Sequence, residues 1–123
     1  MKHFVIAAVA ATAVLGSPAR AGGDSGAGKT LFRSICTLCH STALGENKVG
    51  PSLFGIVGRH SGSVPGYSYS DANKNSRIIW TVDVLDKYLI NPQAVVPGTK
   101  MGYPGQKDDQ KRADIIAYLA TLK

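Results

Sequence analysis

Apolar residues recur at helical spacing in several stretches of the chain, and a short polar residue suited to a helix start precedes each of them. The first stretch places Leu31, Phe32 and Ile35 on one face. Asp24 or Ser25 can accept hydrogen bonds from the free backbone N–H groups at the start of this stretch. The pattern predicts a helix that delivers the chain's two cysteines at its end.

Two longer helices and one short helical turn are expected further along the chain. Thr81 caps a helix over residues 82–90, whose inward face carries Val82, Leu85, Tyr88 and Leu89. This helix stops at Asn91 because the residue before a proline avoids helical backbone angles. The last helix opens at Asp108 or Asp109, and its buried face carries Ile115, Leu119 and Leu122. Ser70 or Asp71 caps the short turn, which runs to Lys74.

Long loops separate these elements. Residues 41–70 are rich in Gly, Pro and Ser, which forbids long helices or strands there. A loop of this length is unusual in a compact domain, and it makes sense if it wraps a large apolar cofactor. A second loop over residues 97–105 has Met101 at its centre. Since no segment alternates as a strand, the sequence predicts an all-α fold of about four to five short helices.

The first 21 residues are typical of a secretory signal peptide. A short basic start precedes an apolar run over residues 4–15, and Ala19-Arg20-Ala21 is a small-x-small cleavage signature. A retained membrane anchor is the alternative, but the apolar run is well short of the ~20 residues needed to cross a bilayer. We therefore predict cleavage after Ala21 and a single mature domain over residues 22–123.

The charge balance is mildly basic. The full chain has 14 basic and 8 acidic residues, and loss of Lys2 and Arg20 with the signal leaves 12 basic residues and a net charge of +4. Nucleic acid is not expected as a partner, because the basic residues are scattered and no recognition motif concentrates them. An acidic protein surface suits this charge better.

The only two cysteines, Cys36 and Cys39, would be exported to an oxidising compartment, where free thiols rarely survive. A thioredoxin-like disulfide belongs with a βαβ pattern, which is absent, and a zinc site needs more ligands than the chain offers. His40 follows Cys39 directly, and Cys-x-x-Cys-His is the signature of covalent haem attachment. We expect His40 to be the proximal iron ligand. The remaining alternative is a redox disulfide whose thiol pKa is tuned by His40.

The sixth iron ligand can be a methionine, a second histidine, a lysine, or absent. Met101 is the only thioether left once Met1 is removed, and it lies in a loop rather than on a helix face. His60 lies in a polar part of the long loop, where we expect an exposed side chain. We favour Met101, which leaves the iron closed and suits electron transfer. An open sixth position would instead favour a small haem peroxidase or a redox or gas sensor module.

The motifs over residues 28–122 resemble the class I c-type cytochromes, which comprise mitochondrial-type cytochrome c and its short bacterial relatives. In this family the first and last helices cross, and the residues that resemble that crossing are Gly28, Phe32, Tyr118 and Leu119. The resemblance implies that the Pro51 carbonyl accepts a hydrogen bond from His40. It also implies that Arg59, Tyr69 and Trp80 contact the haem propionates, and that Asn73, Tyr88 and Thr99 hold a polar network near Met101.

The same resemblance implies a monomeric, soluble one-electron carrier with one covalent haem c, located in the bacterial periplasm, and not an enzyme. Its expected donor is a quinol-oxidising membrane complex, and its expected acceptor is a terminal oxidase or a photosynthetic reaction centre. Ile35 and Leu38 stand at positions where mitochondrial relatives have polar residues. These replacements predict a docking face that is less basic than in those relatives. We expect Lys48, Lys100 and Lys107 near the rim of the haem crevice.

Overall fold

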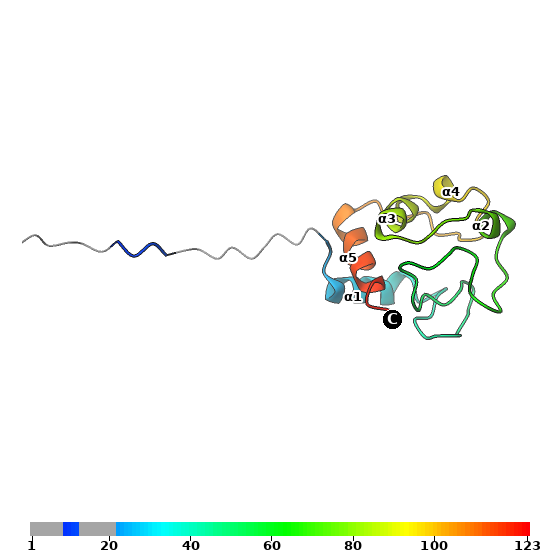
Figure 1. Cartoon of the computed structure of the whole chain (residues 1–123), viewed down its shortest axis with the longest axis horizontal. Helices are drawn as coiled ribbons and strands as arrows, with labels where there is room; N and C mark the ends of the chain where they lie inside the picture. Colours follow the sequence, from blue (N-terminus) through cyan, green and yellow to red (C-terminus); the bar gives the residue numbers. More distant parts are fainter. Residues whose placement is uncertain (1–8, 13–21) are drawn as a thin grey trace, which may run out of the picture.

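The computed structural model describes residues 9–12 and 22–123. The proposed cleavage site at Ala21 and most of the predicted signal peptide lie outside the described residues. Across residues 9–12 and 22–123 the chain forms five helices and no strand, apart from one isolated antiparallel bridge between His60 and Ile79 (Figure 1). The all-α prediction is confirmed. None of these helices combines the length and the apolar character needed to cross a membrane.

The first and last helices cross in contact, as the sequence predicts. They are α1 (Ser25–Ile35) and α5 (Asp109–Leu119), which lie side by side in Figure 1. A Cβ atom at Gly28 would lie 1.8 Å from the backbone oxygen of Asp114, so only glycine permits this approach. Next to this contact, the rings of Phe32 and Tyr118 meet edge to face with 5.3 Å between their centroids.

The caps of the helices explain where they begin. The Asp24 carboxylate accepts hydrogen bonds from the amides of residues 26 and 27, and Ser70 and Thr81 cap α2 (Asp71–Asn75) and α3 (Val82–Ile90) in the same way. Leu85 and Tyr88 of α3 are buried as predicted. Val82, however, was expected on the inward face and is 49% exposed. The prediction for Val82 is wrong because periodicity selects one side of a helix but not how far along it the neighbouring elements reach.

A short helix, α4 (Pro92–Val95), was not predicted. Asn91 ends α3 in an extended conformation with φ −159°, and the chain then starts a new helical turn at Pro92. Proline suits the first position of a helix, because the N–H group it lacks would have no partner there. The same proline therefore ends one helix and begins the next.

The last helix starts where the sequence predicts, since the Asp108 carboxylate accepts a hydrogen bond from the backbone N–H of Lys111. Ile115 and Leu119 are buried in the core, whereas Leu122 follows the end of α5 and is only partly buried. The core is completed by a group of apolar side chains from all parts of the domain: Phe32, Ile56, Trp80, Leu85, Tyr88, Val96 and Ile116.

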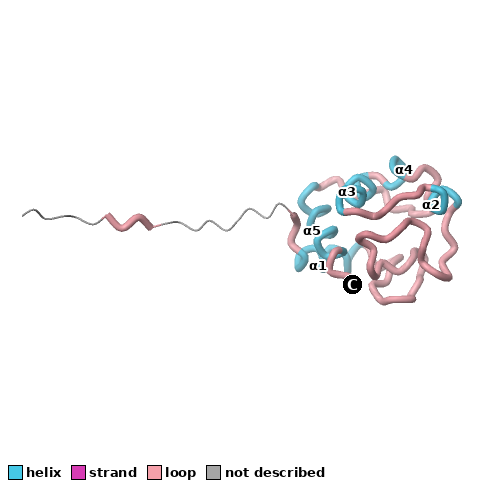
Figure 2. Tube along the Cα trace, viewed as in Figure 1, coloured by secondary structure: helices cyan, strands magenta, loops and turns pink. Residues whose placement is uncertain are grey.

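Residues 41–70 form the long loop that the sequence predicts, on the side of the domain away from the crossing of α1 and α5 (Figure 2). Backbone hydrogen bonds fix this loop to distant parts of the chain. The amide of Gly50 donates to the carbonyl of Cys39 at 2.8 Å, and the amide of Gly55 donates to the carbonyl of Leu122 at 2.7 Å. These contacts hold the loop around the cavity that forms the candidate site.

Candidate cofactor site

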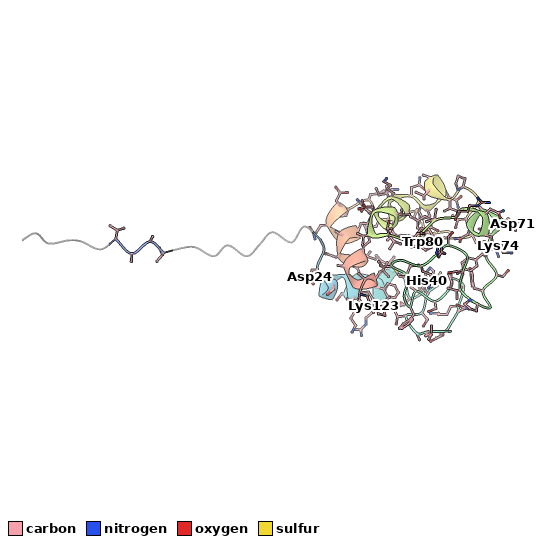
Figure 3. The ribbon with its side chains drawn as sticks, in the orientation of Figure 1. Asp24, His40, Asp71, Lys74, Trp80 and Lys123 are labelled. Carbon is pink, nitrogen blue, oxygen red and sulfur yellow. The ribbon has the colours of Figure 1, made fainter. Side chains whose placement is uncertain are left out.

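A cavity of about 330 Å³ lies between the helices and the long loop. Its volume falls within the range of about 300–1,000 Å³ that is usual for small-molecule and cofactor sites. Figure 3 shows His40 and Trp80 near the centre of the domain, and both line the cavity. All eleven site residues predicted from the sequence lie in its wall: Cys36, Cys39, His40, Pro51, Arg59, Tyr69, Asn73, Trp80, Tyr88, Thr99 and Met101.

The imidazole of His40 is held in one orientation. Its Nδ1 atom lies 2.7 Å from the carbonyl oxygen of Pro51. Because a carbonyl can only accept, Nδ1 carries the hydrogen, and Nε2 keeps its lone pair. Burial lowers the pKa of His40, which favours the neutral ring. This is the state in which an imidazole binds a metal, with its other nitrogen bonded to a backbone carbonyl.

Gly50 packs directly against this ring. A Cβ atom at Gly50 would lie 2.3 Å from Cε1 of His40, 2.7 Å from Nδ1 and 2.8 Å from Nε2. The glycine therefore leaves space that the imidazole fills. The sequence indicated Gly50 only as part of a turn before Pro51, and no local signal reports that a distant ring lies against it.

The loop that carries Met101 is tied to its surroundings through Thr99. The backbone N–H of Met101 donates to Oγ1 of Thr99 at 3.3 Å, and the hydroxyl of Tyr88 lies 3.3 Å from the same oxygen. Burial raises the pKa of Tyr88, so its hydroxyl stays protonated at neutral pH. The side chain of Met101 packs against the hydrophobic core and lines the cavity.

Two buried polar atoms in the cavity wall lack a hydrogen-bond partner among the described residues: Nε of Arg59 and Oδ1 of Asn73. The Nη1 atom of Arg59 donates to the carbonyls of Ser52 and Phe54 at 2.9 and 3.0 Å, which fixes the guanidinium beside the cavity. Buried donors and acceptors are normally paired. A cofactor with acidic groups would supply the missing partner of Arg59, so the site fits a haem with its carboxylates.

Aromatic side chains complete the polar side of the cavity. The hydroxyl of Tyr69 accepts a hydrogen bond from the amide of Val64 at 3.0 Å, and its ring meets that of Tyr67 at 4.7 Å between centroids. The rings of Trp80 and Tyr88 also lie 4.7 Å apart. Tyr67 lines the cavity and donates to the carbonyl of Val49 at 2.7 Å, although the sequence argument gave it no role. Its place beside Tyr69 in a tyrosine-rich stretch was the available signal.

The two cysteines follow α1 directly, with Cys36 at its C-cap. Burial and the neighbouring thiol of Cys39 raise the pKa of Cys36 to about 11. A redox-active Cys-x-x-Cys motif instead depends on a thiol whose pKa is lowered. The raised pKa of Cys36 therefore gives no support to the redox-disulfide alternative.

The mouth of the cavity carries exposed apolar side chains, one of which, Leu38, is a departure from the family pattern. Leu38 is 78% exposed and Val49 is 75% exposed, and both line the cavity. The three lysines expected at the rim each donate to a backbone carbonyl: Lys48 to Thr37 at 2.5 Å, Lys100 to Ser68 at 2.7 Å, and Lys107 to Ile90. These ammonium groups thus fix loops as well as contributing charge.

His60, the other histidine considered as an iron ligand, lies away from this site. Its side chain is exposed as predicted, and its backbone pairs with Ile79 in the isolated bridge. The cavity wall does not include it.

These features define a small helical domain built around one cofactor cavity, with a covalent attachment motif in its wall. Comparison with known proteins identifies the family. The cytochrome c family model matches residues 25–123. Cytochrome c2 of Rhodopila globiformis is 68% identical over 101 residues, which cover 82% of this chain and 95% of the relative. Cytochrome c of Euglena viridis is 54% identical over 101 residues, covering 82% and 99% of the two chains.

A solved structure agrees with the sequence comparisons. Cytochrome cH from Methylobacterium extorquens superposes with a TM-score of 0.75 at 45% identity, covering 80% of this chain and 99% of that one. The chain therefore belongs to the cytochrome c family, as a class I c-type cytochrome. Members of this family bind one covalent haem c and are electron carriers rather than enzymes.

Proposed function

We propose that His40 and Met101 are the two axial ligands of the haem iron, and that Cys36 and Cys39 form the thioether bonds. The observation that supports this assignment most directly is that both candidate ligands line one cavity. The His40–Pro51 contact of 2.7 Å also directs the hydrogen of the ring away from Nε2, leaving that atom free to bind a metal.

The remaining wall residues hold the cofactor and its ligands. Arg59 balances the charge of the haem carboxylates, and Tyr69 and Trp80 hydrogen-bond to them. Asn73, Tyr88 and Thr99 hold the polar network beside Met101, which is supported by the contacts of the Thr99 hydroxyl. When bound, the haem supplies an iron that gains and loses a single electron. The protein keeps water away from it with the aromatic and aliphatic wall of the cavity.

The carrier is exported to the periplasm, with its signal peptide cleaved after Ala21, and it works as a diffusible monomer. The apolar run and the small residues before Gly22 support cleavage. Intact-mass measurement of protein from the periplasm tests this, and a mass that retains residues 1–21 would contradict it.

The partners are membrane complexes on either side of the carrier in an electron-transfer chain. A quinol-oxidising complex donates the electron, and a terminal oxidase or a photosynthetic reaction centre accepts it. The net charge of +4 after cleavage favours acidic docking surfaces on these partners. The exposed Leu38 and Val49 at the mouth of the cavity add apolar contact area.

The axial ligation is tested by replacing Met101 with alanine in the holoprotein. Loss of the thioether should lower the reduction potential and open the iron, so the ferrous variant should bind carbon monoxide while the wild type does not. His60→Ala is the matched control, because an exposed histidine outside the cavity should leave both properties unchanged. Strong carbon monoxide binding by the wild type would contradict the assignment and favour a peroxidase or a sensor.

A further inference from the structure

The backbone before Met101 forms a tight turn over residues 96–99, and a side chain from outside the turn hydrogen-bonds to it. The amide of Thr99 donates to the carbonyl of Val96 at 3.0 Å, and Gly98 has a φ of 88°. Proline at the second position and a left-handed glycine at the third are typical of a type II turn. In such a turn the amide of the third residue has no partner within the turn itself. Here that amide belongs to Gly98.

Gln93, in α4, supplies the partner. Its Oε1 atom accepts a hydrogen bond from the amide of Gly98 at 3.2 Å, and its Nε2 atom donates to the carbonyl of Thr99 at 3.0 Å. The two bonds run in opposite directions, so one amide group fixes two consecutive residues of the turn. Met101 follows the second of these by two positions.

We propose that Gln93 is a positioning residue for the sixth iron ligand: its side chain holds the 96–99 turn against α4 and so limits the release of Met101 from the iron. This inference rests on the proposed ligation by Met101. The short helix α4 holds Gln93 where its side chain reaches the turn.

The other contacts of this loop are made by different groups and remain when Gln93 is changed. Thr99 contacts Tyr88 through its hydroxyl, and the ammonium of Lys100 donates to the carbonyl of Ser68 at 2.7 Å. These contacts join the loop to α3 and to the long loop. Gln93 joins it to α4, so its loss should loosen one side of the loop while the fold persists.

The test uses the ferric holoprotein and imidazole as a probe that competes with Met101 for the iron. Gln93→Ala removes both hydrogen bonds, and imidazole should then bind on the order of tenfold more tightly. Gln106→Ala is the matched control, because Oε1 of Gln106 accepts a hydrogen bond from the amide of Asp108, at the start of α5 and outside the 96–99 turn. Its imidazole affinity should equal that of the wild type.

A second variant separates positioning from a general loss of stability. Gln93→Glu keeps an acceptor for the Gly98 amide but replaces the donor to the Thr99 carbonyl with a carboxylate oxygen, which cannot donate and repels that carbonyl, so its imidazole affinity should also exceed that of the wild type. Thermal unfolding of all variants is measured in parallel. Positioning predicts that imidazole affinity is higher in both Gln93 variants than in the wild type, while Gln93→Ala and Gln106→Ala unfold at similar temperatures.

Two different failures can be distinguished. Ferric haem shows a weak red absorption band when a thioether sulfur binds the iron. If the wild type lacks this band, Met101 is not the ligand, and both the proposed ligation and the role of Gln93 are overturned. If the band is present and Gln93→Ala binds imidazole no more tightly than Gln106→Ala, the ligation stands and the role of Gln93 is overturned.

Discussion

Gly50 lies against the imidazole of His40, so a methyl group at this position should disturb the proposed iron ligand directly. The backbone of Gly50 has no left-handed φ, and alanine can adopt its conformation. The effect of Gly50→Ala is therefore steric. Moving the ring away would break the 2.7 Å contact between its Nδ1 atom and the carbonyl oxygen of Pro51.

The size of the effect follows from the distances. The added methyl carbon would lie 2.3 Å from Cε1 of His40, whereas ordinary van der Waals contacts begin at 3.4 Å. The two atoms must separate by about 1 Å, which moves either the ring or the backbone of the loop. Overpacking of this kind costs roughly 1–3 kcal/mol, and a lost hydrogen bond between His40 and Pro51 adds about 1 kcal/mol. We expect the free energy of unfolding to fall by about 2–4 kcal/mol.

Guanidinium unfolding of the ferric holoprotein measures this change. Gly102→Ala is the matched control, because Gly102 has no positive φ and a Cβ atom there would meet nothing within 4 Å. It should be neutral or stabilising by a few tenths of a kcal/mol. The reduction potential of Gly50→Ala should also rise, since an imidazole that loses its Pro51 contact donates less electron density. Equal stability of the two alanine variants would refute the steric argument.

Three further predictions concern attachment, the helix crossing and docking. Replacing Cys36 and Cys39 with alanine should leave a largely unfolded chain by circular dichroism, because the long loop then has no cofactor to pack on; normal helix content would contradict this. Asp114→Ala removes the acceptor of two hydrogen bonds, from the Asp24 amide at 2.7 Å and Gln110 at 2.8 Å, and should destabilise the domain by about 1–3 kcal/mol in denaturant unfolding. Lys100→Glu should slow bimolecular electron transfer at low salt more than at high salt, where the Debye length falls toward ~3 Å; equal slowing at all ionic strengths would indicate damage to the loop that Lys100 anchors.

Features that depend on neighbouring residues in the sequence were predictable. Asp24, Thr81 and Asp108 cap their helices as expected, because a cap bonds to amides two or three residues further along the same chain. The attachment motif is equally local, since five consecutive residues define it. For the same reason the positions of the thiols at the end of α1 followed from the pattern alone.

Features that depend on what packs against a residue were not predictable. The face of α3 predicted to point inward is buried at Leu85 but exposed at Val82, because the apolar pattern does not indicate how far along the helix the core extends. Pro92 was recognised as the end of α3, but a proline also suits the first turn of a helix, so α4 was missed. The contacts of Gly50 and Gln93 form only when distant segments meet, and they carry no signal in the sequence around them.

The contact between α1 and α5 places a constraint on the order of events during maturation. The amide of Asp24 bonds to a carboxylate 90 residues further along the chain, so this crossing cannot form until the last helix has been made. Contacts this far apart in sequence form slowly, because a long loop must close first. The attachment motif lies near the beginning of the domain and is therefore complete and accessible well before the crossing forms. Its cysteines are therefore available for haem attachment before the first and last helices meet.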